Sequence, residues 1–229
     1  MQIRGGSQPI PRPAQWRSGG EPSWAPPAPD GLWTEAVADR VADYTPSELA
    51  RGPALDSTMS QGRRSAVLVA VYDGAEGATT ILTRRPQHMR KHPGEVSFPG
   101  GNHDDTDVSL WHTATREAHE EVSLDPALPQ QVGELDCFVT GASYSLVQPI
   151  VARLEEPPVL VASPDEVELI LHVPLVELLS PDVYRQEEWF WEGAWRTMHY
   201  FDLIGDTVWG ATALMLHNLL DVVTPSRAK

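Results

Sequence analysis

One stretch of the sequence decides the fold, and it reads Trp111-His112-Thr113-Ala114-Thr115-Arg116-Glu117-Ala118-His119-Glu120-Glu121-Val122. Together with Leu110, which precedes the stretch, small or apolar side chains recur at every fourth position: Ala114, Ala118 and Val122. Because a helix makes one turn in 3.6 residues, these side chains form a single stripe. The spacing therefore predicts an amphipathic helix from about residue 108 to residue 122, with one face against a core.

Three carboxylates of the same stretch lie away from that stripe. Glu117, Glu120 and Glu121 stand at positions i, i+3 and i+4, so their side chains gather on a common helix face. Neighbouring like charges on a helix repel by about 0.2–0.5 kcal/mol per pair in water, and by more when they are desolvated. Such a cluster suits bound divalent cations, and hard oxygen ligands favour Mg²⁺ or Mn²⁺. A solvated acidic helix face is the alternative.

Two features upstream favour a phosphate-binding site. Phe98-Pro99-Gly100-Gly101 places paired glycines before the helix, which lets a loop bring its backbone close to a ligand. Residues 84–92 hold four of the chain's 17 Lys and Arg residues, and we expect Arg85 and Arg90 to bind phosphate oxygens. A tight turn and a solvated basic loop are the respective alternatives.

Length and composition limit the remaining possibilities. The 229 residues suit one domain, predicted at residues 31–229, behind a Pro- and Gly-rich N-terminal arm at residues 1–30. A formal net charge of -15 disfavours binding to nucleic acid. No run of about 18 apolar residues occurs, so we expect no membrane span. Cys137 is the only cysteine, which excludes an intrachain disulfide; we expect a buried thiol and a cytoplasmic protein.

Hydrophobic patterns place the other elements and indicate a mixed α/β protein. Strands are expected at residues 66–72, 79–83, 95–98, 131–139, 145–151 and 166–172, with an aromatic-rich pair at residues 189–191 and 196–201. Helices are expected at residues 32–50 and 207–222. Because strands and helices do not alternate strictly, the pattern favours a mixed sheet between helices over a doubly wound parallel sheet.

Two motifs carry a resemblance to a known family. Residues Arg116 to Leu124 resemble the second half of the Nudix box. In that motif an Arg-Glu dipeptide is followed, after two intervening residues, by a Glu-Glu dipeptide. Residues Ile81 to Gly101, with Arg85, Arg90 and Gly94 among the matched positions, resemble the signature that precedes the box in the coenzyme A pyrophosphatase branch. The resemblance implies the Nudix-type α/β/α sandwich.

The chain departs from these motifs at several positions. Ser123 stands where the box has glycine, and we expect it to end the helix at the cost of local backbone strain. The spacer between Gly101 and Arg116 is one residue longer than usual, so three acids compete for its acidic position: Asp104, Asp105 and Asp107. Pro86 and Glu95 also differ from the branch signature, which bears on substrate identity.

The resemblance assigns roles to individual residues. Glu117, Glu120 and Glu121 would hold Mg²⁺ or Mn²⁺, helped by the Gly101 carbonyl, while Arg116 would pair with a carboxylate and orient the helix. The general base would be Glu166 or Glu120, with Glu166 favoured; the alternative for Glu166 is a solvated loop acid. Substrate phosphates would meet Arg85, Arg90 and the backbone of Gly100 and Gly101.

Three functions follow from this assignment. The first is hydrolysis of the diphosphate of coenzyme A or a derivative to 3′,5′-ADP and a 4′-phosphopantetheine product. The second keeps the chemistry but acts on another nucleotide-type small molecule, such as ADP-ribose, NADH or a nucleoside triphosphate. The third is a Nudix-fold binding module without turnover. Trp189, Trp191 and Trp195 either pack in the core or a homodimer, or stack on an adenine.

Overall fold

A mixed eight-stranded sheet forms the centre of the molecule. The computed structural model describes residues 3–24, 31–47, 63–140 and 145–225. The sheet strands are β2 (Arg64–Gly74), β3 (Gly77–Arg84), β4 (Val96–Ser97), β5 (Gly100–Asn102), β6 (Gln130–Glu134), β7 (Phe138–Val139), β8 (Leu146–Arg153) and β9 (Leu169–Pro174). β2 runs parallel to β8, whereas every other pair of described strands in this sheet is antiparallel. The predicted mixed sheet is therefore confirmed.

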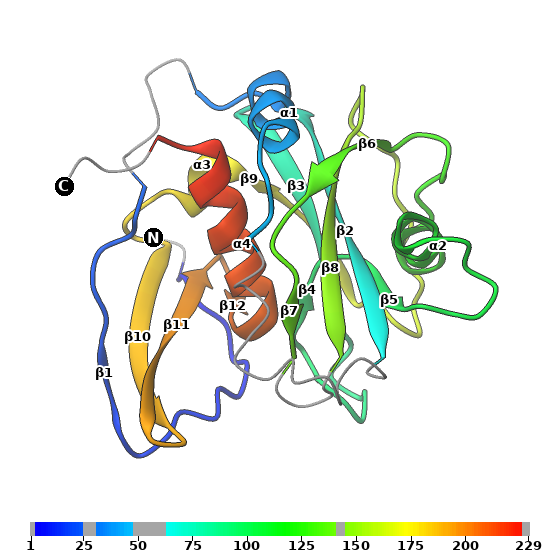
Figure 1. The fold of residues 1–229 in the computed structure, drawn as a ribbon. Helices are drawn as coiled ribbons and strands as arrows, with labels where there is room; N and C mark the ends of the chain where they lie inside the picture. Colours follow the sequence, from blue (N-terminus) through cyan, green and yellow to red (C-terminus); the bar gives the residue numbers. More distant parts are fainter. Residues whose placement is uncertain (1–2, 25–30, 48–62, 141–144, 226–229) are drawn as a thin grey trace.

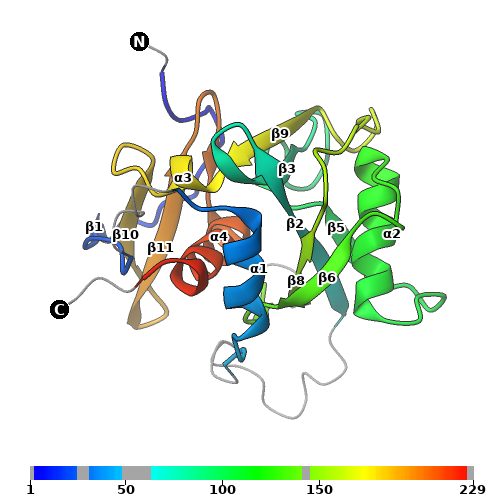
Figure 2. The same ribbon diagram turned by 90° about the horizontal axis from the view of Figure 1, so that it is seen from above.

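Helices cover both faces of this sheet, and a second sheet lies outside them (Figures 1 and 2). Helix α2 (Leu110–Val122) covers one face, and α1 (Thr34–Ala42) and α4 (Gly210–Val223) lie on the other. The second sheet has the order β1 (Trp16–Ser18), β10 (Tyr184–Trp191), β11 (Ala194–Asp202), β12 (Thr207–Val208). A short helix, α3 (Leu175–Leu178), follows β9. The α/β/α sandwich thus carries one further layer that the sequence did not predict.

Helix α2 forms as its sequence predicts. The side chain of Ser109 accepts a hydrogen bond of 3.1 Å from the backbone N–H of His112, which caps the first turn. Ala114, Ala118 and Val122 are fully buried against the central sheet. Ser123 ends the helix with a φ of 56°, the left-handed conformation in which glycine is usual. The expectation of local strain at this position is confirmed.

Several predicted boundaries were wrong, chiefly where short strands meet turns. Gly100 and Gly101 lie in β5, because their missing side chains allow close pairing with β2, and not in a loop. The strand expected at residues 131–139 is two strands with a register shift in the first. The first predicted helix ends at Ala42, and residues 48–50 lie outside the described residues.

Cys137 is partly exposed, so the expectation of a buried thiol was wrong. No helix in the described ranges is long and apolar enough to span a membrane.

The described part of the N-terminal arm packs along the second sheet. β1 pairs with the edge of β10, an edge position that a proline-rich segment tolerates. Arg12 donates two hydrogen bonds to Glu187, one of them 2.9 Å from Nε, and Glu187 also accepts from Arg185 at 2.7 Å and from the Trp189 indole at 2.8 Å. Burial acts to raise the pKa of Glu187, but the hydrogen bonds from Arg12 and Trp189 outweigh it and lower the pKa.

Replacing Arg12 by alanine is expected to lower the free energy of unfolding by about 1–3 kcal/mol. The change leaves the buried Glu187 carboxylate with fewer donors, and an unsatisfied buried polar group costs about that much. Urea denaturation of Arg12→Ala beside Arg12→Lys would measure it, since lysine keeps the charge but loses the two-pronged contact. Wild-type stability in Arg12→Ala would mean that the Arg12–Glu187 contact does not contribute to the free energy of unfolding.

A cluster of aromatic and histidine side chains joins the second sheet to α4. His199 and His217 have ring centroids 3.9 Å apart, and the His199 Nδ1 lies 2.8 Å from the Tyr184 hydroxyl. Asp221 faces His217 at 3.2 Å, and Trp24 packs edge-on against Tyr184. Burial, with a smaller contribution from His217, lowers the pKa of His199 to about 3. Burial also lowers the pKa of His217, against the opposing effect of Asp221.

The free energy of unfolding is expected to fall as pH falls from about 6.5 toward about 3. In that window the unfolded chain protonates His199 while the folded protein keeps it neutral, so protons favour the unfolded state. One such proton contributes at most about 1.4 kcal/mol per pH unit. Urea denaturation at pH 7 and pH 5 should show a smaller loss for His199→Gln than for the wild type. Equal losses in the two proteins would contradict the prediction.

Candidate active site

A polar pocket of about 550 Å³ opens where β5, α2 and the segment before β9 meet. Eight of the nine residues predicted for the site line it: Arg85, Gly100, Gly101, Arg116, Glu117, Glu120, Glu121 and Glu166. The tertiary structure therefore brings together side chains that lie up to 81 positions apart in the sequence. Their chemical roles stay predictions at this point.

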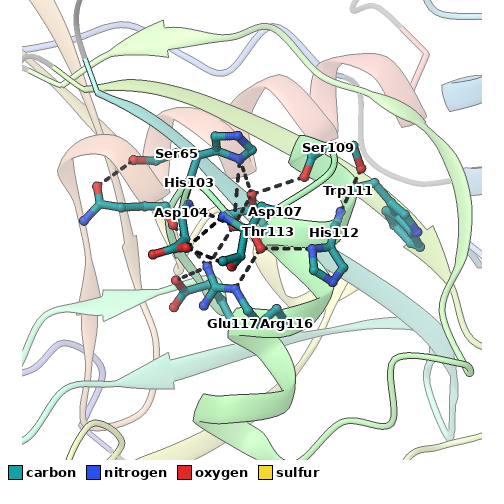
Figure 3. A network of polar contacts seen from close by, with 12 residues as sticks. Ser65, His103, Asp104, Asp107, Ser109, Trp111, His112, Thr113, Arg116 and Glu117 are labelled. Atoms are coloured by element: carbon teal, nitrogen blue, oxygen red, sulfur yellow. Dashed lines mark hydrogen bonds and ion pairs between the residues drawn. The ribbon is translucent and has the colours of Figure 1, made fainter.

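Arg116 connects two of the pocket's acids, Glu117 and Glu120, to the buried Asp107 (Figure 3 shows this network in part). Its Nη1 donates to Glu120 at 3.0 Å, and its Nη2 donates to Glu117 at 2.9 Å and to the Asn102 carbonyl at 3.2 Å. Its Nε and Nη2 also grip the two oxygens of Asp107 at 2.9 and 3.0 Å. The guanidinium thus holds two of the three α2 carboxylates, those of Glu117 and Glu120, in their present orientations.

Of the three candidate acids in the spacer, Asp107 is the one that binds Arg116. Its side chain is fully buried, and it also accepts from the Thr113 hydroxyl at 2.9 Å and from the Asp104 backbone N–H at 3.0 Å. The hydrogen bond from Arg116 holds the pKa of Asp107 well below its usual range, against the opposing effect of burial. His112 lies 3.0 Å away. Asp105 is exposed, and Asp104 closes a local turn with Thr106.

Glu121 is the most deeply buried acid of the pocket, with 3% of its surface exposed. Burial raises the pKa of its carboxyl to about 8; the Gly100 N–H, which donates at 3.3 Å, and Arg85 act in the opposite direction, whereas Glu117 and Glu166 raise it further. Burial likewise raises the pKa of Glu117. The pocket therefore concentrates negative charge that favours a cation or protons.

The glycines of β5 allow the acids and the sheet to approach closely. A side chain at Gly101 would place its Cβ 2.5 Å from the carboxyl carbon of Glu117, and one at Gly100 would lie 2.4 Å from the Ala66 carbonyl oxygen. No other residue fits at either position without moving its neighbours. Paired glycines here serve close packing of β5 between β2 and α2.

Arg85 is the pocket cation without a hydrogen-bonding partner at its buried nitrogen. Its Nε is inaccessible to solvent and has no hydrogen-bond partner among the residues that the structure describes. The side chain lines the pocket and lies close enough to Glu121 to lower its pKa. Because a buried, unsatisfied donor is costly, this guanidinium is suited to receive an anionic ligand.

Glu166 reaches the pocket through the segment that precedes β9. The Ser163 N–H donates to the Glu121 carbonyl at 2.8 Å, and the Val161 N–H donates to the Val122 carbonyl at 3.0 Å, which joins this segment to the end of α2. The strand expected at residues 166–172 begins at Leu169, so Glu166 lies in the turn before it. Its side chain is exposed on the pocket wall. The sequence alone does not distinguish such a residue from a solvated loop acid.

The structure does not bring Arg90 to the pocket, and it separates the tryptophans from it. Arg90 is exposed on the 86–95 loop and does not line the pocket. Trp189 is buried under the arm, whereas Trp191 and Trp195 are 50% and 43% exposed on the β10–β11 hairpin. The expected homodimer stays a prediction. Three pocket residues had no assigned role in the sequence analysis: Asn102, His103 and Thr106.

The residues present fit a hard divalent cation. Carboxylates of Glu117, Glu120 and Glu121 share one wall with the Gly101 backbone, and oxygen donors of this kind suit Mg²⁺ or Mn²⁺. Within the described ranges, however, no three His, Cys, Asp or Glu side chains already stand at metal-binding positions. Arg116 holds Glu117 and Glu120 in their present orientations. A cation held by these two carboxylates would therefore compete with their hydrogen bonds from Arg116.

Comparisons with known proteins show which family the chain belongs to. The NUDIX domain model matches residues 62–201. "Nudix hydrolase 15, mitochondrial" from Arabidopsis thaliana is 37% identical over 161 residues, which cover 67% of this chain and 56% of that protein; the chain thus spans about half the length of this relative. "Uncharacterized Nudix hydrolase NudL" from Yersinia pestis is 35% identical over 71% of this chain and 80% of its own length.

Among solved structures, a MutT/nudix family protein from Enterococcus faecalis superposes with a TM-score of 0.47 at 14% identity, covering 76% of this chain and 64% of that one. The family model covers well over half of the sequence and includes the acidic helix, the paired glycines and Arg85. On the sequence match, this chain belongs to the Nudix family.

Proposed function

We propose that the chain is a divalent-metal-dependent hydrolase that cleaves the diphosphate bond of a nucleoside diphosphate derivative, with coenzyme A or a derivative as the first candidate. One observation carries the proposal: four glutamates and an arginine with an unsatisfied buried nitrogen converge on a single pocket of about 550 Å³. Acids of this number suit metal ions, and the arginine suits a phosphate oxygen.

Different residues of the pocket have different roles in the proposed hydrolysis. Glu117, Glu120 and Glu121, with the Gly101 carbonyl, would hold Mg²⁺ or Mn²⁺. When bound, the cation neutralises phosphate charge and lowers the pKa of water. Arg85 binds a phosphate oxygen, and Arg116 orients Glu117 and Glu120. The water oxygen bonds to one phosphorus while the bridging P–O bond breaks, and two phosphate-bearing products leave.

The proton of the attacking water passes to a carboxylate at the pocket wall. Glu166 is the favoured acceptor because its side chain lines the pocket but has no hydrogen bond that ties it to Arg116. Glu120 is the alternative, and Arg116 already donates to it at 3.0 Å. A general base contributes about 10²–10⁴ in rate. Glu166→Gln would therefore lower kcat by a factor in this range if Glu166 is the base.

The choice of coenzyme A rests on the signature between Ile81 and Gly101. Of its two arginines, Arg85 lines the pocket and supports the proposal, whereas Arg90 is exposed away from it and gives no support. Hydrolysis of coenzyme A, ADP-ribose, NADH and deoxynucleoside triphosphates with Mg²⁺ or Mn²⁺ would test the choice. The highest kcat/KM for coenzyme A is the expected result, and a higher value for another substrate would overturn it.

A binding module without turnover is the second candidate. Ser123, which stands where the Nudix box has glycine, supports this candidate. Calorimetric titration with coenzyme A together with the hydrolysis assay separates the two. Tight binding without products in Mg²⁺ and Mn²⁺ would favour the module, and product release would exclude it.

A further inference from the structure

The N-terminal arm reaches the loop that follows Arg85. The side-chain Nε2 of Gln8 donates to the Gly94 carbonyl at 3.2 Å and to the Asp206 carboxylate at 2.8 Å. Its Oε1 accepts from the Thr207 backbone N–H at 3.0 Å. Both ends of the amide are therefore engaged, which fixes the position of the side chain between the loop and the turn before β12.

Asp206 connects Gln8 to the end of β3. Its carboxylate is 1% exposed and accepts from Arg84 at 3.0 and 3.2 Å. The Nε of Arg84 lies 3.3 Å from Glu168, whose backbone N–H donates to the Arg84 carbonyl at 2.8 Å. Arg84 is the last residue of β3, and Arg85, which follows it, lines the pocket; the contacts of Arg84 therefore hold the backbone from which the Arg85 side chain extends.

The two ends of the 86–95 loop meet directly beside the Gln8 contact, and this place is called the loop neck below. The Arg85 N–H donates to the Glu95 carbonyl at 2.9 Å, so Arg85 and Glu95 close the loop. Gly94, which precedes Glu95, has a φ of 68°, and a Cβ there would lie 2.2 Å from the Gln87 amide nitrogen. The carbonyl that Gln8 holds therefore belongs to a backbone position that few other residues can adopt.

We propose that Gln8 is a positioning residue for Arg85: its amide holds the loop neck to the Asp206–Arg84 pair and thereby orders the Arg85 guanidinium for a substrate phosphate. The inference rests on the proposed function, because it assigns Arg85 to phosphate binding. It extends that function to a residue of the N-terminal arm, which does not line the pocket. The expected consequence is weaker substrate binding without slower chemistry when Gln8 is lost.

A double-mutant cycle between Gln8 and Arg85 tests the proposal. Gln8→Ala is expected to raise KM for the preferred substrate about 3–10-fold, with kcat within about twofold of wild type. In an Arg85→Ala background, the same change should alter KM less than about twofold, since Gln8 acts through Arg85. If the role of Gln8 were merely structural, Gln8→Ala would change KM by the same factor in the wild-type and Arg85→Ala backgrounds. Unchanged KM, or a fall in kcat alone, would also overturn the proposal.

Control variants separate this effect from misfolding. Ser7→Ala changes an exposed neighbour on the arm and should leave KM unchanged. If Gln8→Ala does not fold, Gln8→Met replaces it, because methionine has a similar volume but lacks the amide donors and adds no charge beside the buried Asp206. The expected KM change and its loss in the Arg85→Ala background are the same.

Binding of methylenediphosphonate, a non-hydrolysable analogue of pyrophosphate, repeats the cycle without turnover. With Mg²⁺ present, Gln8→Ala should raise its dissociation constant about 3–10-fold in the wild-type background only. A wild-type protein that binds the analogue but hydrolyses no substrate contradicts the proposed function alone. Equal dissociation constants for the wild type and Gln8→Ala contradict the role of Gln8 alone.

Discussion

Glu120→Gln is expected to lower kcat/KM for the preferred substrate by roughly 10³-fold while the free energy of unfolding changes little. In the proposed site Glu120 holds the cation, so its loss would remove several kcal/mol of transition-state stabilisation, and each 1.36 kcal/mol is a factor of ten. The side chain of Glu120 is 54% exposed and forms a surface ion pair with Arg116. Such pairs contribute at most about 1 kcal/mol to stability. Steady-state kinetics with Mg²⁺, beside urea denaturation, measure both quantities.

Glu156→Gln is the matched control for this variant. Glu156 is an exposed glutamate outside the pocket, so the same chemical change there should leave kcat/KM within about twofold of wild type. Near wild-type turnover of Glu120→Gln would remove Glu120 from the catalytic machinery. A tenfold rise in the Mg²⁺ concentration needed for half-maximal rate, at unchanged kcat, would instead assign it to metal binding without a further role.

Asp107→Ala is expected to lower the free energy of unfolding by about 3 kcal/mol. Removing one partner of a buried ion pair costs about 3–5 kcal/mol, because the remaining charge is left uncompensated. Asp107 is fully buried and binds Arg116 through both oxygens. Arg116 keeps Glu117 and Glu120 in the variant, so we expect the lower end of that range. Urea denaturation at neutral pH measures the difference.

Asp105→Ala provides the comparison within the same spacer. Asp105 is exposed, so its loss should change stability by less than about 0.5 kcal/mol. The sequence leaves Asp104, Asp105 and Asp107 as equal candidates, and only the contact with Arg116 distinguishes them. Similar losses for Asp105→Ala and Asp107→Ala would show that the buried pair does not hold this part of the fold together.

The helix and its acids follow from sequence because their determinants are local. Leu110 to Val122 carries its own stripe, cap and terminating Ser123, and a 3.6-residue repeat alone places Glu117, Glu120 and Glu121 on one face. The boundaries that failed are those of short strands such as β5 and β7, whose limits depend on pairing with β2 and β8. Such pairing is a property of distant segments, and residue preferences predict it poorly.

By itself the sequence determined the acidic helix, the paired glycines and the mixed α/β class. It also identified residues 84–92 as a segment rich in Lys and Arg. Only the tertiary structure decided between residues of equal local character: Asp107 over its neighbours, Arg85 over Arg90, and a pocket position for Glu166. It also brought Gln8 to Gly94, although 86 positions separate them. Local periodicity fixes which face a side chain occupies, whereas the partner that it meets there depends on how distant segments pack.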